Sequence, residues 1–384
     1  MPELSPQQSH KPRPRALVVG STFGSHYVRA LTHPNSPITL AGLVGRGSAR
    51  SQQLAAEVGV PFYPLPDAPT MEESIAHADL PDVEMACVVV RSAISGGPGD
   101  DMVNAFLKRG ITVVQEHPVH TTSVIDHLFT ARNARNGTAG NSGGTARNGS
   151  APYYALNSFY LNLPPVQNFL HCVQQVRQQS QVKAIEVRAS IHVLYPVLDI
   201  VAHLIPGALP RLILQQQVQI VQHPAHPEVV NVSIDWGGAP VDIRLYNRIA
   251  PSDPDNHAQP LFACVVETAD GELSLDHVHA PTRWQPRSHS VDGRVTADGN
   301  QLSCRIVGDP ACAQECTADQ IFHELWPQGV QRKLRQVWAV TTQEQVFGQK
   351  DLGVVQLWQD IVGQLPTPVP IDSVPPTPIT FSAI

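Results

Sequence analysis

Apolar residues in the first 160 positions gather into short unbroken runs, which stretches of mixed polarity separate. The runs predict strands at 15–20, 38–45, 61–63, 82–90, 111–115 and 153–157. The stretches between them predict helices at 21–33, 48–58, 100–109 and 121–132. Strands that are apolar on both faces and alternate with helices are typical of a doubly wound parallel sheet. We therefore expect a Rossmann-like α/β domain at 15–160, after a disordered polar tail at 1–14.

The pattern changes after about residue 180, where apolar and polar residues begin to alternate. Strand-like runs follow at 183–192, 211–222, 229–236, 241–248, 261–267 and 272–278, and helical patterns return at 317–325, 330–342 and 352–362. Alternation predicts an antiparallel sheet with one exposed face. We therefore expect residues 161–384 to form an α+β domain, with a large open antiparallel sheet, that binds substrate and dimerises. A second copy of the chain would cover the exposed face, which predicts a homodimer.

Residues 131–150, ARNARNGTAGNSGGTARNGS, differ from both patterns. The segment is rich in Gly, Asn, Ser and Thr and holds no aromatic residue, so it cannot bury a core. It predicts a flexible surface insertion in the first domain. A functional lid is the alternative.

Composition narrows the function. The formal net charge is −7, from 26 basic and 33 acidic residues, which argues against binding to nucleic acid or to an anionic membrane. The sequence has no run long enough for a signal peptide or a membrane span, so we expect a cytoplasmic protein. The six cysteines are far apart, and neither Cys312 with Cys316 nor His277 with His279 is completed by a second pair at metal-site spacing. No metal is expected.

The first strand-to-helix turn carries a dinucleotide signal. Its residues are Gly20, Ser21, Thr22, Phe23 and Gly24, in which the two glycines permit a tight turn and a close approach of the helix N-terminus to a pyrophosphate. This G-x3-G pattern is weaker than G-x-G-x-x-G, and a plain glycine-rich turn would look alike. Its place after the first strand favours the cofactor site.

The loop after the second strand indicates which dinucleotide. An NAD site usually has an acid here for the ribose 2′-hydroxyl, but this chain has Arg46, Ser48 and Arg50. Two guanidiniums beside a helix N-terminus suit a 2′-phosphate, so NADP(H) is predicted. A solvated helix start with a capping serine is the structural alternative.

Two further loops follow strands of the same sheet. Arg91 and Ser92 come after the fourth strand, and the stretch VVQEHPVH brings Glu116, His117 and Pro118 to the end of the fifth. The carboxyl ends of parallel strands border the ligand crevice of such folds. These residues are therefore predicted to contact the cofactor.

This ordered set of motifs resembles the Gfo/Idh/MocA oxidoreductase superfamily, in which the fifth motif is usually Glu-Lys-Pro and histidine here replaces lysine. Within it, the chain resembles the thiazolinyl imine reductases of siderophore assembly. The distinctive stretches are VVGSTFGSHYVRAL, GLVGRGSARSQQLA, CVVVRSAISGGPG, GITVVQEHPVH and LNSFY, which cover most of 15–162. The second domain matches mainly in layout and in Leu194-Tyr195 and Leu198-Asp199, and the 131–150 segment is not expected of the family.

The resemblance implies NADPH-dependent reduction of a thiazoline C=N bond to a thiazolidine. The substrate would be tethered by phosphopantetheine to a carrier domain of a nonribosomal peptide synthetase. Pro118 would fix the loop beside the nicotinamide ribose, Glu116 would help to position it, and residue 117 would face the reacting centre. An imidazole titrates near neutrality, so His117 can supply the proton, and Tyr160 matches the family's acid tyrosine. A loop-anchoring histidine and a packing tyrosine are the structural alternatives.

Asp199 and His203 leave another reading open. Their i, i+4 spacing places both on one helix face, and the same spacing carries catalysis in the sugar-type members of the superfamily. A sugar or cyclitol dehydrogenase with His203 as base is therefore an alternative function. A non-catalytic NADP(H)-binding regulator is a third, although it would need no acid at positions 117 and 160.

Overall fold

The computed structural model describes residues 13–140, 152–205, 218–236, 238–252, 260–292, 294–295, 303–341, 349–375, 377 and 379. The chain divides into two compact units. Met1–Phe159 and Phe322–Gly348 belong to the first, and Tyr160–Ile321 and Gln349–Ile384 belong to the second. The first crossing lies within one residue of the expected boundary. The return of residues 322–348 to the first unit differs from the expected assignment of all residues after 160 to one domain.

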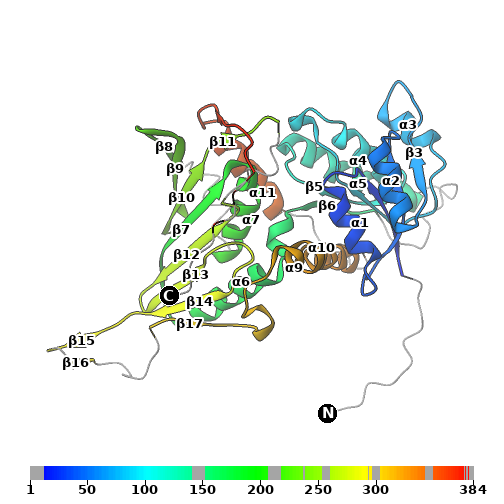
Figure 1. Ribbon diagram of the computed structural model, residues 1–384. Coiled ribbons are helices and arrows are strands. Elements are labelled where there is room, and N and C mark those ends of the chain that lie inside the picture. The colour runs from blue at the N-terminus through cyan, green and yellow to red at the C-terminus, as the bar shows by residue number, and fades with distance from the viewer. Residues whose placement is uncertain are drawn as a thin grey trace, which may run out of the picture. The chain divides into compact units, whose positions relative to one another are not determined.

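A six-stranded parallel sheet forms the centre of the first unit, in the order β3-β2-β1-β4-β5-β6 (Figure 1). Its strands are β1 (Arg15–Val19), β2 (Thr39–Gly45), β3 (Phe62–Pro64), β4 (Met85–Val88), β5 (Thr112–Glu116) and β6 (Tyr154–Asn157). Every residue of β4, β5 and β6 is buried, which is why these strands read as unbroken apolar runs. The predicted doubly wound α/β fold is confirmed.

The helices of this unit are α1 (Gly24–Thr32), α2 (Ala49–Val58), α3 (Met71–His77), α4 (Gly99–Lys108) and α5 (Thr121–Gly140). Helix α3 was not predicted, although Thr70 and Glu73 cap its start reciprocally, a pattern that the sequence contains. Helix α5 continues well past the predicted end at residue 132. The first ten residues of the expected flexible insertion are therefore helical, because the alanines and arginines at its start favour a helix. Residues 141–150 lie outside the described residues.

Helix α10 (Trp326–Thr341) explains why the chain returns to the first unit. It packs against α1, and its Val330, Leu334 and Val337 are buried at the spacing of one helix face. The Gln331 side chain donates a buried hydrogen bond of 2.9 Å to the Ala30 carbonyl. The helical pattern was predicted, but its partner lies some 300 positions away in the chain, and periodicity alone cannot indicate it.

The second unit is built on an eight-stranded sheet in the order β17-β14-β13-β12-β7-β10-β9-β8 (Figure 1). Its strands are β7 (Val182–Ser190), β8 (Val218–His223), β9 (His226–Trp236), β10 (Ala239–Tyr246), β12 (Ala263–Thr268), β13 (Gly271–Leu275), β14 (Thr282–Pro286) and β17 (Arg305–Ile306). The expected antiparallel sheet is in fact mixed, because β10 runs parallel to β7. The two strands are separated by the β8–β9 hairpin in the chain, and β10 returns beside β7 in the same direction. Most of the predicted strand at 211–222 lies outside the described residues.

One face of this sheet is covered by helices. Helices α6 (Pro164–Arg177) and α7 (Leu194–Leu204) contact the strands, and α11 (Gln349–Val362) contacts α7 (Figure 1). The opposite face carries the exposed residues of the alternating strands. Within the described residues, no helix is both long and apolar enough to span a bilayer.

Candidate active site

The candidate site lies at the carboxyl edge of the parallel sheet. The strand order reverses between β1 and β4, and the loops that follow these strands border the crevice in which doubly wound folds bind ligands. The loops after β1, β2, β4 and β5, together with the adjoining ends of β5, α1 and α2, hold all of the predicted cofactor residues. The sheet therefore brings together four segments that are far apart in the sequence.

The turn after β1 is shaped by its first glycine. Gly20 has a φ of +98°, and a Cβ added there would lie 2.5 Å from the carbonyl oxygen of Val89. No larger side chain fits without a shift of the backbone. Helix α1 begins directly afterwards with Phe23 as its N-cap, and the Phe23 side chain provides no capping hydrogen bond. The Ser25 and His26 amides donate to the carbonyls of Thr22 and Phe23 at 3.3 and 3.0 Å. The positive end of the helix dipole at this turn fits the pyrophosphate of a dinucleotide.

The loop after β2 is tied to this turn by hydroxyl groups. Ser48 caps α2, as predicted, by accepting from the Ser51 amide at 3.3 Å. The hydroxyls of Ser48 and Ser51 lie 2.8 Å apart, and Ser51 donates to the Ser21 hydroxyl at 2.8 Å. Arg46 and Arg50 are exposed on the same loop. The loop therefore offers two cationic side chains on a backbone that is fixed against the first turn.

The loop after β4 packs against the loop after β5. Ser92 donates a hydrogen bond of 2.5 Å to the Pro118 carbonyl. The chain then curls around the carbonyl of Arg91, which accepts from the Gly99 amide at 2.9 Å. A Cβ at Gly97 would lie 2.2 Å from that carbonyl oxygen, so the loop requires glycine there. The backbone of Arg91 is held in place while its side chain is exposed.

A buried polar network holds the loops after β4 and β5 from the interior of the first unit. Asp100 accepts hydrogen bonds from Gln115 at 2.7 Å, from Ser123 at 2.9 Å and from the Ala93 amide at 3.2 Å. The fully buried His127 has its Nε2 3.5 Å from Asp100 Oδ1. Burial raises the pKa of Asp100, but the hydrogen bonds outweigh burial and bring this pKa down to about 2. The carboxylate therefore stays charged and holds the start of the β4 loop.

His117 is fixed by the acid that precedes it. Its Nδ1 lies 2.9 Å from Glu116 Oε1 and 3.3 Å from the Asn157 carbonyl oxygen. Both partners are acceptors, so the geometry places a proton on Nδ1. The His117–Pro118 peptide bond is cis. The ring thus presents a defined tautomer at the end of β5.

Glu116 itself is held by two residues that sequence reasoning missed. Its Oε2 accepts a hydrogen bond from the Tyr27 hydroxyl, and Asn157 Nδ2 donates to the same oxygen at 3.1 Å. Asn157 Nδ2 also lies 2.5 Å from the Tyr27 hydroxyl. Glu116 is 9% exposed, and Tyr27 and Asn157 are fully buried. Among the described residues, the Glu116 carboxylate contacts Tyr27, Asn157 and His117. Its expected role beside the nicotinamide ribose stays a prediction.

The charge of Glu116 acts on its buried neighbours. Burial raises the pKa of Tyr27 well above its usual value, and the nearby Glu116 carboxylate raises it further. Burial and Glu116 likewise raise the pKa of the Cys87 thiol. Tyr27 and Cys87 therefore keep their protons at neutral pH. Tyr27 and Asn157 occur in stretches that carried the family resemblance, but contacts across 89 and 41 positions leave no local pattern that would reveal these roles.

The remaining predicted residues belong to the second unit. Tyr160 is 9% exposed and its carbonyl accepts from the Leu163 amide at 3.1 Å. Asp199 is buried on α7, and His203 Nδ1 donates to its backbone carbonyl at 2.8 Å. The same nitrogen lies 3.5 Å from Asp199 Oδ1, which is buried and has no hydrogen-bond partner among the described residues. The i, i+4 pairing of Asp199 with His203 is therefore present.

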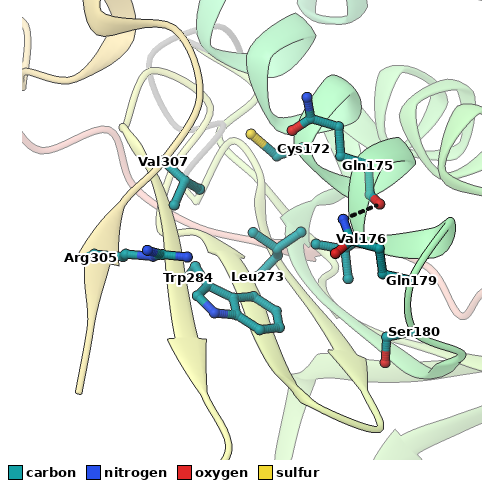
Figure 2. A pocket seen from close by; sticks show the side chains of 9 residues that line it. All are labelled: Cys172, Gln175, Val176, Gln179, Ser180, Leu273, Trp284, Arg305 and Val307. Carbon is teal, nitrogen blue, oxygen red and sulfur yellow. Dashed lines mark hydrogen bonds between the residues drawn. The ribbon is translucent and has the colours of Figure 1, made fainter. Parts of the chain in front are cut away.

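The second unit also contains an open cavity of about 320 Å³ between α6 and the β13–β14–β17 edge (Figure 2). Trp284, Leu273 and Val176 provide much of its apolar lining, and Arg305 lies beside Trp284 at its border. None of the predicted site residues lines it.

Comparisons with known proteins agree with this geometry. Residues 15–136 match the model of the oxidoreductase family with an NAD-binding Rossmann fold, and residues 180–285 match the model of the C-terminal region of Irp3-like thiazolinyl imine reductases. A search among curated proteins gave no match.

Solved structures share the fold at low identity. A levoglucosan dehydrogenase in complex with NADH and levoglucosan is 10% identical, with a TM-score of 0.62 over 92% of this chain and 97% of that one. A Gfo/Idh/MocA family oxidoreductase from Vibrio cholerae is 12% identical, with a TM-score of 0.59 over 91% and 97%. GenD2 from gentamicin A biosynthesis, in complex with NAD, is 13% identical, with a TM-score of 0.56 over 94% and 95%. The first unit thus carries an NAD-binding Rossmann domain of the Gfo/Idh/MocA oxidoreductase family at residues 15–136, and the second unit carries a C-terminal region of the Irp3-like type at residues 180–285.

Proposed function

We propose that this protein reduces the C=N bond of a thiazoline to a thiazolidine, with NADPH as the reductant and a carrier-tethered siderophore intermediate as the substrate. The observation that carries the proposal is the match of residues 180–285 to the C-terminal region of thiazolinyl imine reductases. The histidine at position 117, where the superfamily usually has lysine, supports it. An imidazole near neutrality is better matched than an ammonium to protonation of an imine nitrogen.

Different residues of the chain would have different roles in such a reduction. A bound nicotinamide dinucleotide in its reduced form supplies the hydride. The turn at Gly20–Gly24 would hold the pyrophosphate, and the paired loops after β4 and β5 would border the reacting carbon. His117 or Tyr160 would deliver the proton to the imine nitrogen. A tyrosine is a weak acid in water, so Tyr160 would act late or through a hydrogen bond to the developing amine.

The choice of NADP(H) rests on the loop after β2. The segment from Gly45 to Ser51 contains Arg46 and Arg50 and no acid. Both guanidiniums are exposed beside the N-terminus of α2. A 2′-phosphate there would gain charge-assisted hydrogen bonds, while the ribose hydroxyl of NAD would find no carboxylate.

Two partners follow from the proposal. One is the carrier domain of a nonribosomal peptide synthetase that presents the thiazoline. The other is a second copy of the chain, which would cover the exposed face of the eight-stranded sheet. Neighbouring strands place Glu186 beside Asp242 and Arg188 beside Arg244 on that face. These acidic and basic rows could pair across a two-fold axis.

A second candidate is an NADP-dependent dehydrogenase of a sugar or cyclitol. The pairing of Asp199 with His203 on α7 favours it, because an imidazole whose Nδ1 donates to a carbonyl keeps Nε2 as a base. The levoglucosan dehydrogenase shares the fold. In this reading His203 would abstract the hydroxyl proton of the substrate.

One experiment separates the two functions. NADPH oxidation would be followed with a thiazoline thioester on a carrier domain, and NADP+ reduction with a panel of sugars and cyclitols. The proposal expects turnover of the thiazoline and none of the panel. Turnover of a sugar that His203→Ala abolishes, with no thiazoline reduction, would establish the dehydrogenase.

A further inference from the structure

We propose that Tyr27 is a positioning residue for the proton donor: by holding Glu116, it fixes the orientation and tautomer of His117 and tunes the pH at which His117 releases its proton. The inference rests on the proposed function in so far as His117 is taken as the donor. It concerns a residue of α1 that has no contact with substrate in that scheme.

Two hydrogen bonds join three side chains in the order Tyr27, Glu116 and His117. Tyr27 donates to Glu116 Oε2, and Glu116 Oε1 accepts from His117 Nδ1 at 2.9 Å. Asn157 helps to hold Glu116, because its Nδ2 donates to Glu116 Oε2 at 3.1 Å. Its backbone carbonyl oxygen lies 3.3 Å from His117 Nδ1. Each carboxylate oxygen thus has its own donors, so the carboxylate plane is fixed in the direction that His117 needs.

The end of this hydrogen-bond network that contains Tyr27 is closed to solvent. Tyr27, Asn157 and the neighbouring Cys87 are each 0% exposed. Tyr27 and Cys87 also hold their protons tightly, since burial and Glu116 raise the pKa of each. A proton lost by His117 therefore cannot be replaced through Glu116 and Tyr27. The network therefore acts on the orientation of His117 and on the charge beside it.

The Tyr27 hydroxyl also favours one charge state of the pair. When His117 is neutral, Glu116 and His117 together carry one negative charge, which the hydroxyl stabilises directly. When His117 is protonated, the pair is neutral overall and gains less from the same hydrogen bond. Loss of the hydroxyl should therefore make the pair bind its proton more tightly. Loss of the carboxylate charge should have the opposite effect.

The test is a titration of the intact protein labelled with 15N-histidine, with NMR detection of both ring nitrogens. The signals of His117 would be assigned by their loss in His117→Gln. In the unmodified protein Nδ1 should carry the proton above the midpoint. Tyr27→Phe should raise the midpoint of the His117 titration by about one unit, a tenfold gain in proton affinity. Glu116→Gln should lower it.

Tyr154→Phe is the matched control. Tyr154 is 3% exposed and its hydroxyl donates to Gln115 Oε1 at 2.7 Å, so this change also removes a buried tyrosine hydroxyl that bonds to a β5 side chain. It should cost stability and leave the His117 midpoint in place. If Tyr27→Phe does not fold, Asn157→Ser withdraws a donor from the same carboxylate oxygen and should raise the midpoint by a smaller amount.

The possible outcomes separate this inference from the proposed function, because the titration needs no substrate. A midpoint that is the same in Tyr27→Phe, Asn157→Ser and the unmodified protein would overturn the inference, as would the opposite tautomer, even if thiazoline reduction is found. A raised midpoint in Tyr27→Phe with a lowered one in Glu116→Gln would support it, even if the substrate proves to be a sugar.

Discussion

The loops after β5 and β2 meet the same edge of the parallel sheet but are built in opposite ways. The β5 loop is enclosed: the side chain of His117 is 14% exposed and that of Glu116 is 9% exposed, and Tyr27 and Asn157 fix them from the interior. The β2 loop is open, with Arg46 and Arg50 exposed and only the serine hydroxyls tied inward. In the proposed reaction, the β5 loop would hold the proton donor in place and the β2 loop would offer positive charge to the cofactor.

The difference indicates what each loop requires. Proton transfer depends on sub-ångström placement, so its donor needs a rigid and dry support. Recognition of a 2′-phosphate depends on attraction between opposite charges, which tolerates flexible arginines in solvent but weakens in salt. Changes at the β5 loop should therefore affect turnover and stability, and changes at the β2 loop should affect cofactor affinity.

The largest effect is expected for the double variant His117→Ala with Tyr160→Phe. Both candidate acids are then lost, and general acid catalysis typically contributes about 100- to 10,000-fold. Thiazoline turnover should fall by at least about 100-fold, while the NADPH dissociation constant should change much less because the other predicted cofactor contacts remain. Each single variant should be milder, because the other acid or a water can substitute. Nearly intact reduction by the double variant would show that the proton comes from elsewhere.

The next largest effect concerns folding stability at low pH, to which the hydrogen bonds of Asp100 contribute. The pKa of Asp100 in the folded protein is about 2, against 3.8 in the unfolded chain, so its contribution is complete above about pH 5 and is lost as the pH falls through 3.8 toward 2. Asp100→Asn should lower the unfolding free energy at pH 7 by about 2 kcal/mol and flatten its acid dependence. Urea unfolding at several pH values would measure this. The exposed neighbour Asp101→Asn is the control, and equal losses in both variants would contradict the role of the network.

A smaller effect is expected on the open loop. Replacement of Arg46 and Arg50 by alanine should raise the NADPH dissociation constant about tenfold, since two exposed ion pairs contribute about 1 to 2 kcal/mol together. The NADH constant should change little, and the difference between the cofactors should shrink at high salt. Fluorescence titration at two salt concentrations measures both. Lys108→Ala removes a positive charge from another part of the first unit and should affect neither cofactor; equal losses for NADPH and NADH would count against NADP(H).

The smallest effect should come from the link between the two cofactor turns. Ser51→Ala removes the hydroxyl that joins Ser48 to Ser21. A neutral hydrogen bond contributes about 1 kcal/mol, so NADPH affinity should fall by roughly fivefold at most, with turnover at saturation unchanged. Ser36→Ala, which removes another buried hydroxyl of the first unit, is the control. A larger loss of turnover than of affinity would mean that the β2 loop also shapes the reacting centre.

The sequence predicts most of the open loop and only part of the enclosed one. Arg46, Ser48 and Arg50 lie within one stretch, and capping is a local interaction, so the β2 loop could be interpreted from its own residues. The support of His117 depends on Tyr27 and Asn157, which reach Glu116 from 89 and 41 positions away. Only the fold brings them together. In the same way, the parallel pairing of β10 with β7 and the packing of α10 on α1 are set by tertiary contacts that no local period encodes.

Isotope transfer can show directly whether this protein delivers hydride to a C=N carbon. NADPH that carries deuterium at the transferred position would be incubated with the protein and a carrier-tethered thiazoline, and the released product would be analysed by mass spectrometry. We expect a thiazolidine with a single deuterium on the former C=N carbon. An unlabelled product, or an unreduced thiazoline with a sugar oxidised by NADP+ in its place, would contradict it.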